Sequence, residues 1–564
     1  MSSRQFSRAE RWRSLSEERF DVLVVGGGIT GAGIARDAAL RGLRVALVEK
    51  GDFGSGTSSH SSRLVHGGLR YLETYEFGLV FESTHERARL MRQAPHLVRP
   101  LSFVMPIYRG GRPGMFLMRM GMLLYDSLAA FRNYRRHRRL SPAGLHRREP
   151  ALETEGLRGA YRYYDCITDD GRLTLENILD AQALGATCLN YARFHAPLHE
   201  EHGEAKRIRG AVVEDVLTGA RREVCATVIV NAVGPWLDEL RALFGEGGGE
   251  RLMPSKGAHI VLPRERLPVS SAVVMSAPRD GRPVFAIPWE SATFVGTTDT
   301  EFDGSPDSVY ADRDDVDYLL ETVQKFFAKQ ALTREDVLST WAGIRPLVSR
   351  GAGTTYRASR EHAVESRADG VVMISGGKLT TYRIMATDAV DAAVTLLTAR
   401  QPERRVPRSA TRERPLPGGL GLADDARRRE VLAEQEALAA RLGLDEATRR
   451  HCFETYGVRA TALLEDAARD SSLAIPIVDG LPYLWAEVDF AAEQELVERL
   501  DDFLLRRTYL LLKAPAATLA AASAVAERLA LARGWDEARL AEEVARFKAL
   551  AAAHTACLVP SGEE

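Results

Sequence analysis

A triplet of glycines near the amino end constrains the fold more than any other feature of the sequence. Gly26, Gly28 and Gly31 follow the apolar run 20–25 and lead into the alanine-rich segment 29–40, which has helical spacing. In such a strand–turn–helix unit, the glycines permit a tight turn, the approach of a pyrophosphate and close packing of helix on strand. The unit predicts a dinucleotide site, because free N–H groups and the helix dipole attract phosphate there.

The acid that such a site needs stands in the expected place. Residues 44–48 form a second apolar run, which Glu49 follows directly. A carboxylate at this position accepts hydrogen bonds from the ribose hydroxyls and repels a 2′-phosphate. The residues predicted to hold the dinucleotide in this unit are Gly26, Gly27, Gly28, Ile29, Thr30, Gly31, Glu49 and Lys50.

Two later segments favour FAD over NAD, because a flavin must be enclosed by distant parts of the chain. Residues 228–236 and 374–382 are each typical of a buried strand that ends in a small-residue turn, and the second continues into a helix. N–H groups at that helix start are suited to the flavin N1/O2 edge, where negative charge develops on reduction. The residues predicted on this side of the cofactor are Ala232, Gly234, Trp236, Gly376, Gly377, Lys378, Leu379 and Thr380.

The composition excludes several other classes of protein. The chain has 564 residues, with 45% hydrophobic and 27% charged residues, as in ordinary globular proteins. Its 75 basic and 77 acidic side chains give a net charge of −2, so we predict no nucleic-acid partner. No apolar run has the length of a membrane span, and no secretory signal is evident. The five cysteines are scattered without a C-x-x-C pair, so we predict no metal site, no disulfides and a cytoplasmic location.

Composition also divides the chain into four predicted regions. A flexible N-terminus covers 1–17, and an oxidoreductase domain with interleaved cofactor and substrate parts covers 18–410. Proline and glycine mark 411–422 as a linker, and helical spacing of alanine, leucine, glutamate and arginine predicts a helical domain over 423–564. The clearest further strands are predicted at 224–231, 259–262, 292–296 and 370–375.

Eight short motifs follow one another along the chain: GGGITGAGIA at 26–35, TSS at 57–59, HGGLRYLE at 66–73, NAVGPW at 231–236, GAHI at 257–260, GTTD at 296–299, GIRPL at 343–347 and GGKLTTYR at 376–383. With these motifs in this order, the chain resembles, over about residues 18–515, the FAD-dependent (aerobic, respiratory) glycerol-3-phosphate dehydrogenase family. YLWAEV at 483–488, LDD at 500–502 and RRT at 506–508 are similar to the helical cap of that family. The motifs at 66–73 and 376–383 together identify this family more specifically than the glycine triplet, which many flavoproteins share. Ala258 stands where members often carry serine, which would remove one hydroxyl contact.

The resemblance implies an α/β fold, with an FAD-binding Rossmann-type domain like those of glutathione reductase and amino-acid oxidases. An inserted substrate-binding β-sheet region and a C-terminal all-α domain would complete it. It also implies oxidation of sn-glycerol 3-phosphate to dihydroxyacetone phosphate, with hydride transfer to FAD and electrons passed to a membrane quinone. The enzyme would lie peripherally on the cytoplasmic face of the inner membrane. Within the shared motifs, further cofactor-binding residues are predicted at Thr57, Ser58, Ser59, Ser62, His66, Gly67 and Gly68.

The implied substrate is a phosphate dianion with a secondary alcohol, and the motifs carry cations beside glycine turns. Arg70, Arg345 and Lys378 are predicted to bind phosphate, since a guanidinium fork suits two phosphate oxygens. His259 is the preferred general base because imidazole titrates near the working pH, and Arg345 and Lys378 are the other catalytic candidates. The sequence leaves open whether Arg345 holds phosphate or the developing alkoxide. The remaining predicted substrate contacts are Tyr71, Thr298 and Asp299.

Residues 109–148 combine ten arginines and a single acid, Asp126, with the apolar stretches 115–118 and 120–125. A methionine-rich apolar helix beside arginines is typical of an element that docks on anionic lipid. The segment therefore predicts contact with a peripheral membrane surface. The alternative is a buried helix followed by a solvated arginine patch.

The sequence is also compatible with three other functions. The first is a soluble glycerol-3-phosphate oxidase that passes electrons to oxygen, and the second is an FAD-dependent amine or amino-acid oxidase. The third is a non-catalytic flavin-binding module whose helical domain recruits partners. The second cation, Lys378, disfavours the amino-acid oxidase, and the number of glycine turns disfavours the module. The sequence does not determine the oligomeric state, for which a homodimer is one option.

Overall fold

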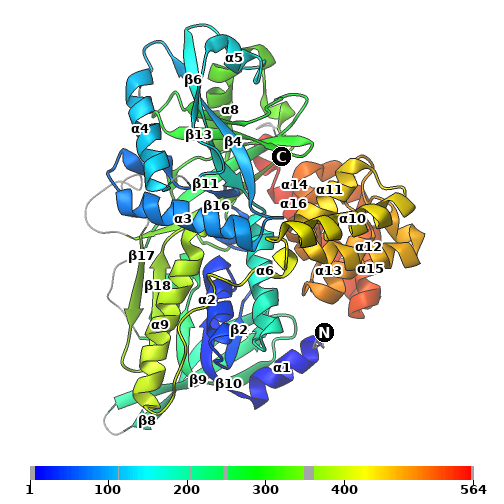
Figure 1. Ribbon diagram of the computed structural model, residues 1–564. Helices are drawn as coiled ribbons and strands as arrows, with labels where there is room; N and C mark the ends of the chain where they lie inside the picture. Colours follow the sequence, from blue (N-terminus) through cyan, green and yellow to red (C-terminus); the bar gives the residue numbers. More distant parts are fainter. Residues whose placement is uncertain are drawn as a thin grey trace.

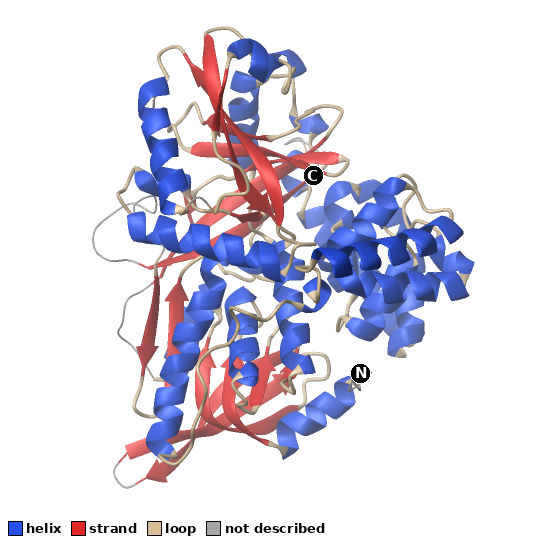
Figure 2. Ribbon diagram, viewed as in Figure 1, coloured by secondary structure: helices blue, strands red, loops and turns tan. Residues whose placement is uncertain are grey.

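The computed structural model (Figure 1) describes residues 7–111, 114–130, 132–202, 205–245, 252–348 and 361–559. Two sheets form the core of the larger part of the molecule. The helices of the C-terminal part gather beside them on one side (Figures 1 and 2).

The first sheet is built around a row of parallel strands. β1 pairs with β10 on one side and with β2 on the other, so its apolar run is buried on both faces. In sheet order the parallel strands are β18 (Val371–Gly376), β10 (Arg221–Asn231), β1 (Arg19–Val25), β2 (Val45–Val48) and β7 (Thr187–Leu189). β17 (His362–Ser366) closes one edge, and the hairpin of β8 (Ala192–His202) and β9 (Ala205–Asp215) extends from β10.

Three helices lie side by side on this sheet: α2 (Ile29–Leu40), α6 (Asp170–Ala183) and α9 (Tyr382–Arg400). α2 lies between the other two, and its alanine-rich sequence lets it pack closely. A Cβ on Gly33 would lie 2.9 Å from the ring of Tyr382 at the start of α9. The first strand–helix–strand unit is thus confirmed with the predicted bounds to within a residue.

The second sheet is antiparallel over most of its length and carries His259 on one of its strands and Arg345 on another. Its main order is β15 (Thr300–Glu301), β11 (Leu252–Pro263), β14 (Ala292–Gly296), β13 (Pro283–Trp289), β12 (Ala272–Ser276), β4 (Arg99–Tyr108), β6 (Leu157–Ile167) and β3 (Leu64–Val65). β16 (Ser339–Val348) pairs with β11, and β5 (Arg138–Leu140) pairs with β6. The helices around this sheet are α3 (Phe77–Gln93), α4 (Met115–Leu128), α5 (Pro142–His146) and α8 (Arg313–Phe326). α7 (Leu237–Leu243) follows β10. The predicted strands at 224–231, 259–262, 292–296 and 370–375 correspond to β10, β11, β14 and β18.

The N-terminal segment differs from its prediction. Residues 8–17 form helix α1 (Arg8–Glu17), which begins with a capping box between Ser7 and Glu10. Leu15 is fully buried, and Arg8 forms an ion pair with Asp215 at 2.8 Å. The prediction of a flexible N-terminus is therefore wrong for residues 8–17. The prediction rested on the polar composition of the segment and did not consider its capping box or the burial of Leu15. Residues 1–6 lie outside the described part of the chain.

The C-terminal part is helical and packs directly on the second sheet. Its helices are α10 (Asp425–Arg441), α11 (Glu446–Tyr456), α12 (Ala460–Arg469), α13 (Ala486–Gln494), a π-helix (Asp502–Arg507), α14 (Leu510–Lys513), α15 (Pro515–Arg533) and α16 (Glu537–Ala553). Its Leu510 and Phe503 share one hydrophobic cluster with Trp289 and Trp341 of the sheet. The segment 411–422 also packs against the rest of the chain, since Leu416 is fully buried. None of the helices in the described ranges is long and apolar enough to cross a membrane.

Candidate active site

The glycine turn after β1 has no room for side chains. Gly26 has a φ of +107°, and a Cβ on it would lie 2.7 Å from the carbonyl oxygen of Ala232 at the end of β10. A Cβ on Gly31 would lie 1.9 Å from the carbonyl oxygen of Gly26, so the first turn of α2 rests on the strand end. Gly28 caps α2 and has no side chain of its own to cover the backbone N–H groups of the first helical turn. This cradle fits the pyrophosphate of a dinucleotide.

Two polar side chains accept hydrogen bonds from backbone N–H groups of this turn. Glu49 Oε2 accepts the N–H of Gly27 at 2.6 Å, and its Oε1 accepts the N–H of Gly51 at 2.8 Å. Ser58 Oγ accepts the N–H of Ile29 at 2.9 Å. Desolvation raises the pKa of the Glu49 carboxyl, and the two backbone N–H groups act against that rise. Both side chains lie beside the turn for which the sequence predicts the cofactor's ribose and pyrophosphate.

The predicted flavin side is assembled from segments far apart in the sequence. The N–H of His66 donates to Thr380 Oγ1 at 3.2 Å, and that hydroxyl donates back to the His66 carbonyl at 3.3 Å. β18 runs through a short 3₁₀ turn, Leu379–Thr381, into α9, which confirms the predicted strand, turn and helix. At the end of β10, Lys50 Nζ lies 4.3 Å from the ring centre of Trp236.

A cavity of about 840 Å³ lies beside this cradle, and it brings the predicted cofactor and substrate residues together. From the predicted sets, the lining includes Ile29, Thr57, Ser58, Ser62, His66, Gly68, Arg70, Tyr71, His259, Thr298, Asp299, Arg345, Gly376, Gly377, Lys378, Leu379 and Thr380. The other predicted cofactor residues belong to the described part of the chain but do not line the cavity: Gly26, Gly27, Gly28, Thr30, Gly31, Glu49, Lys50, Ser59, Gly67, Ala232, Gly234 and Trp236. Gly67 instead donates its N–H to Asp165 Oδ1 at 3.1 Å, with no space for a Cβ beside Tyr125.

Arg345, on β16, has a fixed orientation at one side of the cavity. Its Nη1 donates to Ser255 Oγ at 3.1 Å and lies 3.4 Å from Asp299 Oδ1. Its Nη2 donates to Thr297 Oγ1 at 2.9 Å. Strand pairing creates this cluster, because Ser255 on β11 lies directly opposite Arg345. The guanidinium is therefore oriented before any substrate arrives.

His259, on β11, is buried beside Arg345 and keeps a neutral ring. The ring stacks on Trp341 with centroids 4.6 Å apart, and Nε2 lies 2.9 Å from Ser62 Oγ. Burial first, and then the charges of Arg345 and Arg63, hold the pKa of His259 well below its usual range. A neutral imidazole at pH 7 is the state in which this residue can accept a proton.

The two other predicted cations meet on one aromatic ring. Lys378 Nζ lies 4.7 Å from the ring centre of Tyr71, and the Arg70 guanidinium carbon lies 5.3 Å from it. A Cβ on Gly68 would lie 2.3 Å from that ring, so the position requires glycine for close packing. With Arg345, these residues bring three cations from three segments to one cavity, as a phosphate dianion requires.

Sequence reasoning missed the residues that support this arrangement. Ser255 and Thr297 hold Arg345, and Arg282 pairs with Asp299 Oδ2 at 3.0 Å. Thr297 lies inside the motif at 296–299 and Ser255 lies two residues before the motif at 257–260, so their positions could have indicated a role in the site. No pattern in the sequence signalled Arg282, whose place depends on how distant strands pair.

Apolar side chains also line the cavity, and α4 contributes one of them. Phe103, Phe285 and Met118 line it, the last from the inner face of α4. The outer face of the same helix is open to solvent: Phe116 is 78% exposed and Leu117 is 65% exposed. A buried helix, the alternative from the sequence, does not describe that outer face.

The chain segment that contains this exposed apolar face is rich in exposed arginines. The exposed members of the basic segment are Arg109, Arg119, Arg132, Arg135, Arg136, Arg138, Arg139, Arg147 and Arg148, while Arg112 lies outside the described residues. α3 contacts α4 and adds the exposed side chains of Phe77 and Phe81. Large exposed apolar patches in soluble chains mark interaction sites.

Comparison with known proteins places this fold and site in a class. The family model described as FAD dependent oxidoreductase matches residues 21–383. The model described as the C-terminal domain of alpha-glycerophosphate oxidase matches residues 409–540. The protein is an FAD-dependent oxidoreductase with a C-terminal helical domain, and FAD is the cofactor that the glycine cradle fits.

Individual relatives indicate which family of FAD-dependent oxidoreductases the chain belongs to. Glycerol-3-phosphate dehydrogenase 2 of Mycobacterium bovis is 40% identical over 543 residues, which cover 96% of this chain and 90% of the relative. The aerobic glycerol-3-phosphate dehydrogenase of Staphylococcus saprophyticus is 35% identical over 513 residues, 90% of each protein. The X-ray structure of the glycerol-3-phosphate dehydrogenase from Bacillus halodurans, complexed with FAD, matches with a TM-score of 0.79 and 32% identity over 99% of both chains. The chain therefore belongs to the FAD-dependent glycerol-3-phosphate dehydrogenase family, as its motifs predicted.

Proposed function

We propose that the protein oxidises sn-glycerol 3-phosphate to dihydroxyacetone phosphate and passes the electrons from FAD to a membrane quinone. The observation that carries the proposal is the shared lining of one cavity. Cofactor-loop residues, the cations Arg70, Arg345 and Lys378, and the neutral His259 meet there. The activity in the names of the relatives supports the same substrate.

The residues of the cavity account for substrate binding and proton removal. Arg70 and Lys378 hold the phosphate, while Arg345 is oriented toward either the phosphate or the C2 oxygen. When bound, FAD supplies the acceptor for the hydride from C2. The C2 hydroxyl must lose its proton as the carbonyl forms. Ser62 lines the cavity 2.9 Å from His259 Nε2, so its hydroxyl is placed to relay that proton to the imidazole.

The negative charge of the bound substrate would raise the proton affinity of His259. The positive charges of Arg345 and Arg63 are among the causes that keep His259 neutral in the free protein. A phosphate dianion in the cavity offsets those charges, so the proton affinity of the imidazole rises when substrate binds. The base then accepts the proton in the complex more readily than in the free protein.

Two features support a quinone in a membrane as the acceptor. One part of the cavity is lined by apolar side chains, including Phe103, Phe285 and Met118. Met118 on the buried face of α4 lines the cavity, and the exposed face of the same helix carries Phe116 and Leu117 within the arginine-rich segment 109–148. An apolar face in an arginine-rich segment suits contact with anionic lipid. A quinone in the membrane would then lie on the other side of α4 from the cavity.

The second candidate is an oxidase that passes electrons to oxygen, and the match to the C-terminal domain of alpha-glycerophosphate oxidase favours it. Anaerobic mixing of the holoprotein with glycerol 3-phosphate and with amino acids tests the substrate. We expect bleaching of the flavin by glycerol 3-phosphate alone, and bleaching by amino acids alone would overturn the assignment.

Reoxidation of the bleached protein then tests the acceptor. We expect rapid reoxidation by a quinone analogue in detergent and slow reoxidation by dissolved oxygen. Rapid oxygen uptake without quinone would instead establish the oxidase.

A further inference from the structure

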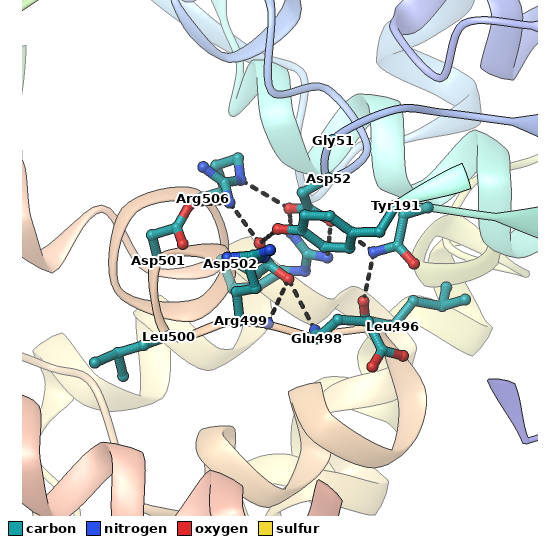
Figure 3. A network of polar contacts seen from close by, with 12 residues as sticks. Gly51, Asp52, Tyr191, Leu496, Glu498, Arg499, Leu500, Asp501, Asp502 and Arg506 are labelled. Atoms are coloured by element: carbon teal, nitrogen blue, oxygen red, sulfur yellow. Dashed lines mark hydrogen bonds and ion pairs between the residues drawn. The ribbon is translucent and has the colours of Figure 1, made fainter. Parts of the chain in front are cut away.

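The C-terminal helical domain contacts the loop of residues 49–62, which lies between β2 and β3 and contains both Glu49 and Ser58. Asp52 in this loop is 1% exposed. Its carboxylate accepts hydrogen bonds from the guanidinium groups of two neighbouring arginines (Figure 3). Arg507 binds it through two nitrogens, at 2.7 Å and 3.1 Å, and Arg506 Nε lies 2.8 Å away.

The arginines come from an unusual element. Residues Asp502–Arg507 form a π-helix, in which the N–H of Thr508 donates to the carbonyl of Phe503 at 3.1 Å. Such turns are rare and occur frequently at functional sites. Consecutive side chains of an α-helix point about 100° apart. In this turn both Arg506 and Arg507 reach the same carboxylate.

A second contact from the same segment reaches the other end of the loop. Tyr509 Oη donates to Asp170 Oδ1 at 3.1 Å. Asp170 Oδ2 accepts both the N–H of Ser61, at 3.1 Å, and its hydroxyl, at 2.7 Å. Ser61 directly precedes Ser62, which contacts His259. Residues 502–509 thus attach to the cofactor loop before and after its phosphate-side turn.

The contact of Asp52 with the two arginines is part of a buried ionic network (Figure 3). Arg506 Nη2 lies 2.5 Å from both Asp501 Oδ2 and Asp502 Oδ1. Tyr191 Oη donates to Asp502 Oδ1 at 2.5 Å. Removal of one partner from such a network leaves a buried charge uncompensated, which strongly destabilises the arrangement. The conformation of the loop is therefore coupled to the docking of the helical domain.

We propose that Arg506, Arg507 and Tyr509 of the helical domain are positioning residues for FAD, which hold loop 49–62 in the conformation that binds the adenosine ribose and the pyrophosphate. The inference extends from the FAD requirement of the family and does not depend on the substrate or the electron acceptor. Glu49 and Ser58 would contact the cofactor, and the three helical-domain residues would act only through the loop.

The test compares two variants of the full-length chain that each lose one buried arginine. Arg507→Gln removes the two-nitrogen contact with Asp52. Arg172→Gln is the matched control, because Arg172 on α6 pairs with Glu495 of the helical domain at 2.5 Å, with both side chains 0% exposed. The control removes an equally buried contact between the same two parts of the chain but leaves Asp52 paired.

FAD affinity is measured by quenching of FAD fluorescence with the apoprotein, well below its unfolding temperature. We expect Arg507→Gln to raise the Kd for FAD at least about tenfold and Arg172→Gln to change it less than about twofold, although both lower the unfolding temperature. Amide hydrogen exchange of residues 49–59 in the apoprotein should accelerate in Arg507→Gln alone. Equal FAD affinity in the two variants, or unchanged exchange in the loop, would overturn the proposal.

A milder variant keeps the test decisive if Arg507→Gln does not fold. Tyr509→Phe removes only the hydroxyl that binds Asp170. We expect it to fold, to raise the Kd for FAD and to accelerate exchange at Ser61. An unchanged Kd together with unchanged exchange would count against the positioning role.

Discussion

At the residue scale, the orientation of one guanidinium decides much of the chemistry. Arg345 is held by Ser255, Thr297 and Asp299 before substrate binds. Donors that are fixed in advance lower the barrier because they need no rearrangement when charge develops on the substrate. The three supporting contacts therefore contribute to catalysis through Arg345.

Replacement of Arg345 by alanine is expected to lower kcat/KM for glycerol 3-phosphate by roughly 10²–10³-fold, about 3–4 kcal/mol of transition-state stabilisation. Steady-state kinetics at equal FAD content measure the effect. Arg345→Lys keeps the charge but loses the planar fork, so an intermediate loss is expected. Wild-type kinetics in the alanine variant would remove Arg345 from the active site.

A second residue-scale prediction concerns the buried His96. Burial, followed by the charges of Arg459, Arg172 and Arg99, lowers the pKa of His96 to about 3. The unfolded chain protonates this histidine below about pH 6.5, but the folded protein does not, so the residue makes folding less favourable as pH falls. Its contribution is absent above that pH and grows by about 1.4 kcal/mol per pH unit below it.

The variant His96→Asn should therefore gain relative stability in acid. We expect the difference in the free energy of unfolding, variant minus wild type, to rise by about 1.2 kcal/mol as the pH falls from 6 to 5. Urea unfolding at several pH values measures this difference. A difference independent of pH would show that His96 titrates alike in both states.

At the element scale, the sequence predicts what short-range patterns determine. The unit β1–α2–β2 follows from an apolar run and the glycines at 26, 28 and 31, all of which act within one turn. The pairing of β11 with β16 could not be predicted, because it joins residues about ninety positions apart. That pairing places Ser255 opposite Arg345 and Trp341 opposite His259. The sequence motifs therefore predicted Arg345 and His259 but not the contacts that orient these two side chains.

Helix α4 gives a prediction at this scale, which tests the proposed membrane contact. The double variant Phe116→Glu, Leu117→Glu places charge on the exposed apolar face. Loss of two apolar side chains that would be buried in lipid should weaken binding to vesicles of phosphatidylcholine and anionic phosphatidylglycerol by about 10- to 100-fold. Co-sedimentation measures the binding, and activity with a soluble dye should stay unchanged.

Leu531→Glu is the matched control, because Leu531 is 87% exposed on α15, in the helical domain. This variant should bind vesicles like the wild type. Added salt should weaken the binding of the wild type, since screening reduces the attraction between arginines and lipid. Equal vesicle binding by the α4 variant and the control would contradict docking through α4.

At the scale of the whole molecule, the predicted linker and helical domain suggest a separable part, but the packing joins them to the sheets. Phe503 and Leu510 share a hydrophobic cluster with Trp289 and Trp341 of the second sheet. Ser339 Oγ on β16 donates to the carbonyl of Leu512 at 2.6 Å. Composition reveals that a segment is helical, but not that its apolar side chains complete the core of a distant sheet.

This shared core predicts how the full chain unfolds. Loss of the helical domain would expose Trp289 and Trp341 and leave the carboxylate of Asp52 without its two arginines. The larger part alone would therefore carry an exposed apolar surface and a carboxylate without its ion-pair partners, which makes partly unfolded states costly. We expect differential scanning calorimetry of the holoprotein to show one transition, with a van't Hoff enthalpy close to the calorimetric enthalpy. Two resolved transitions, with the flavin released in only one, would show that the helical domain unfolds independently.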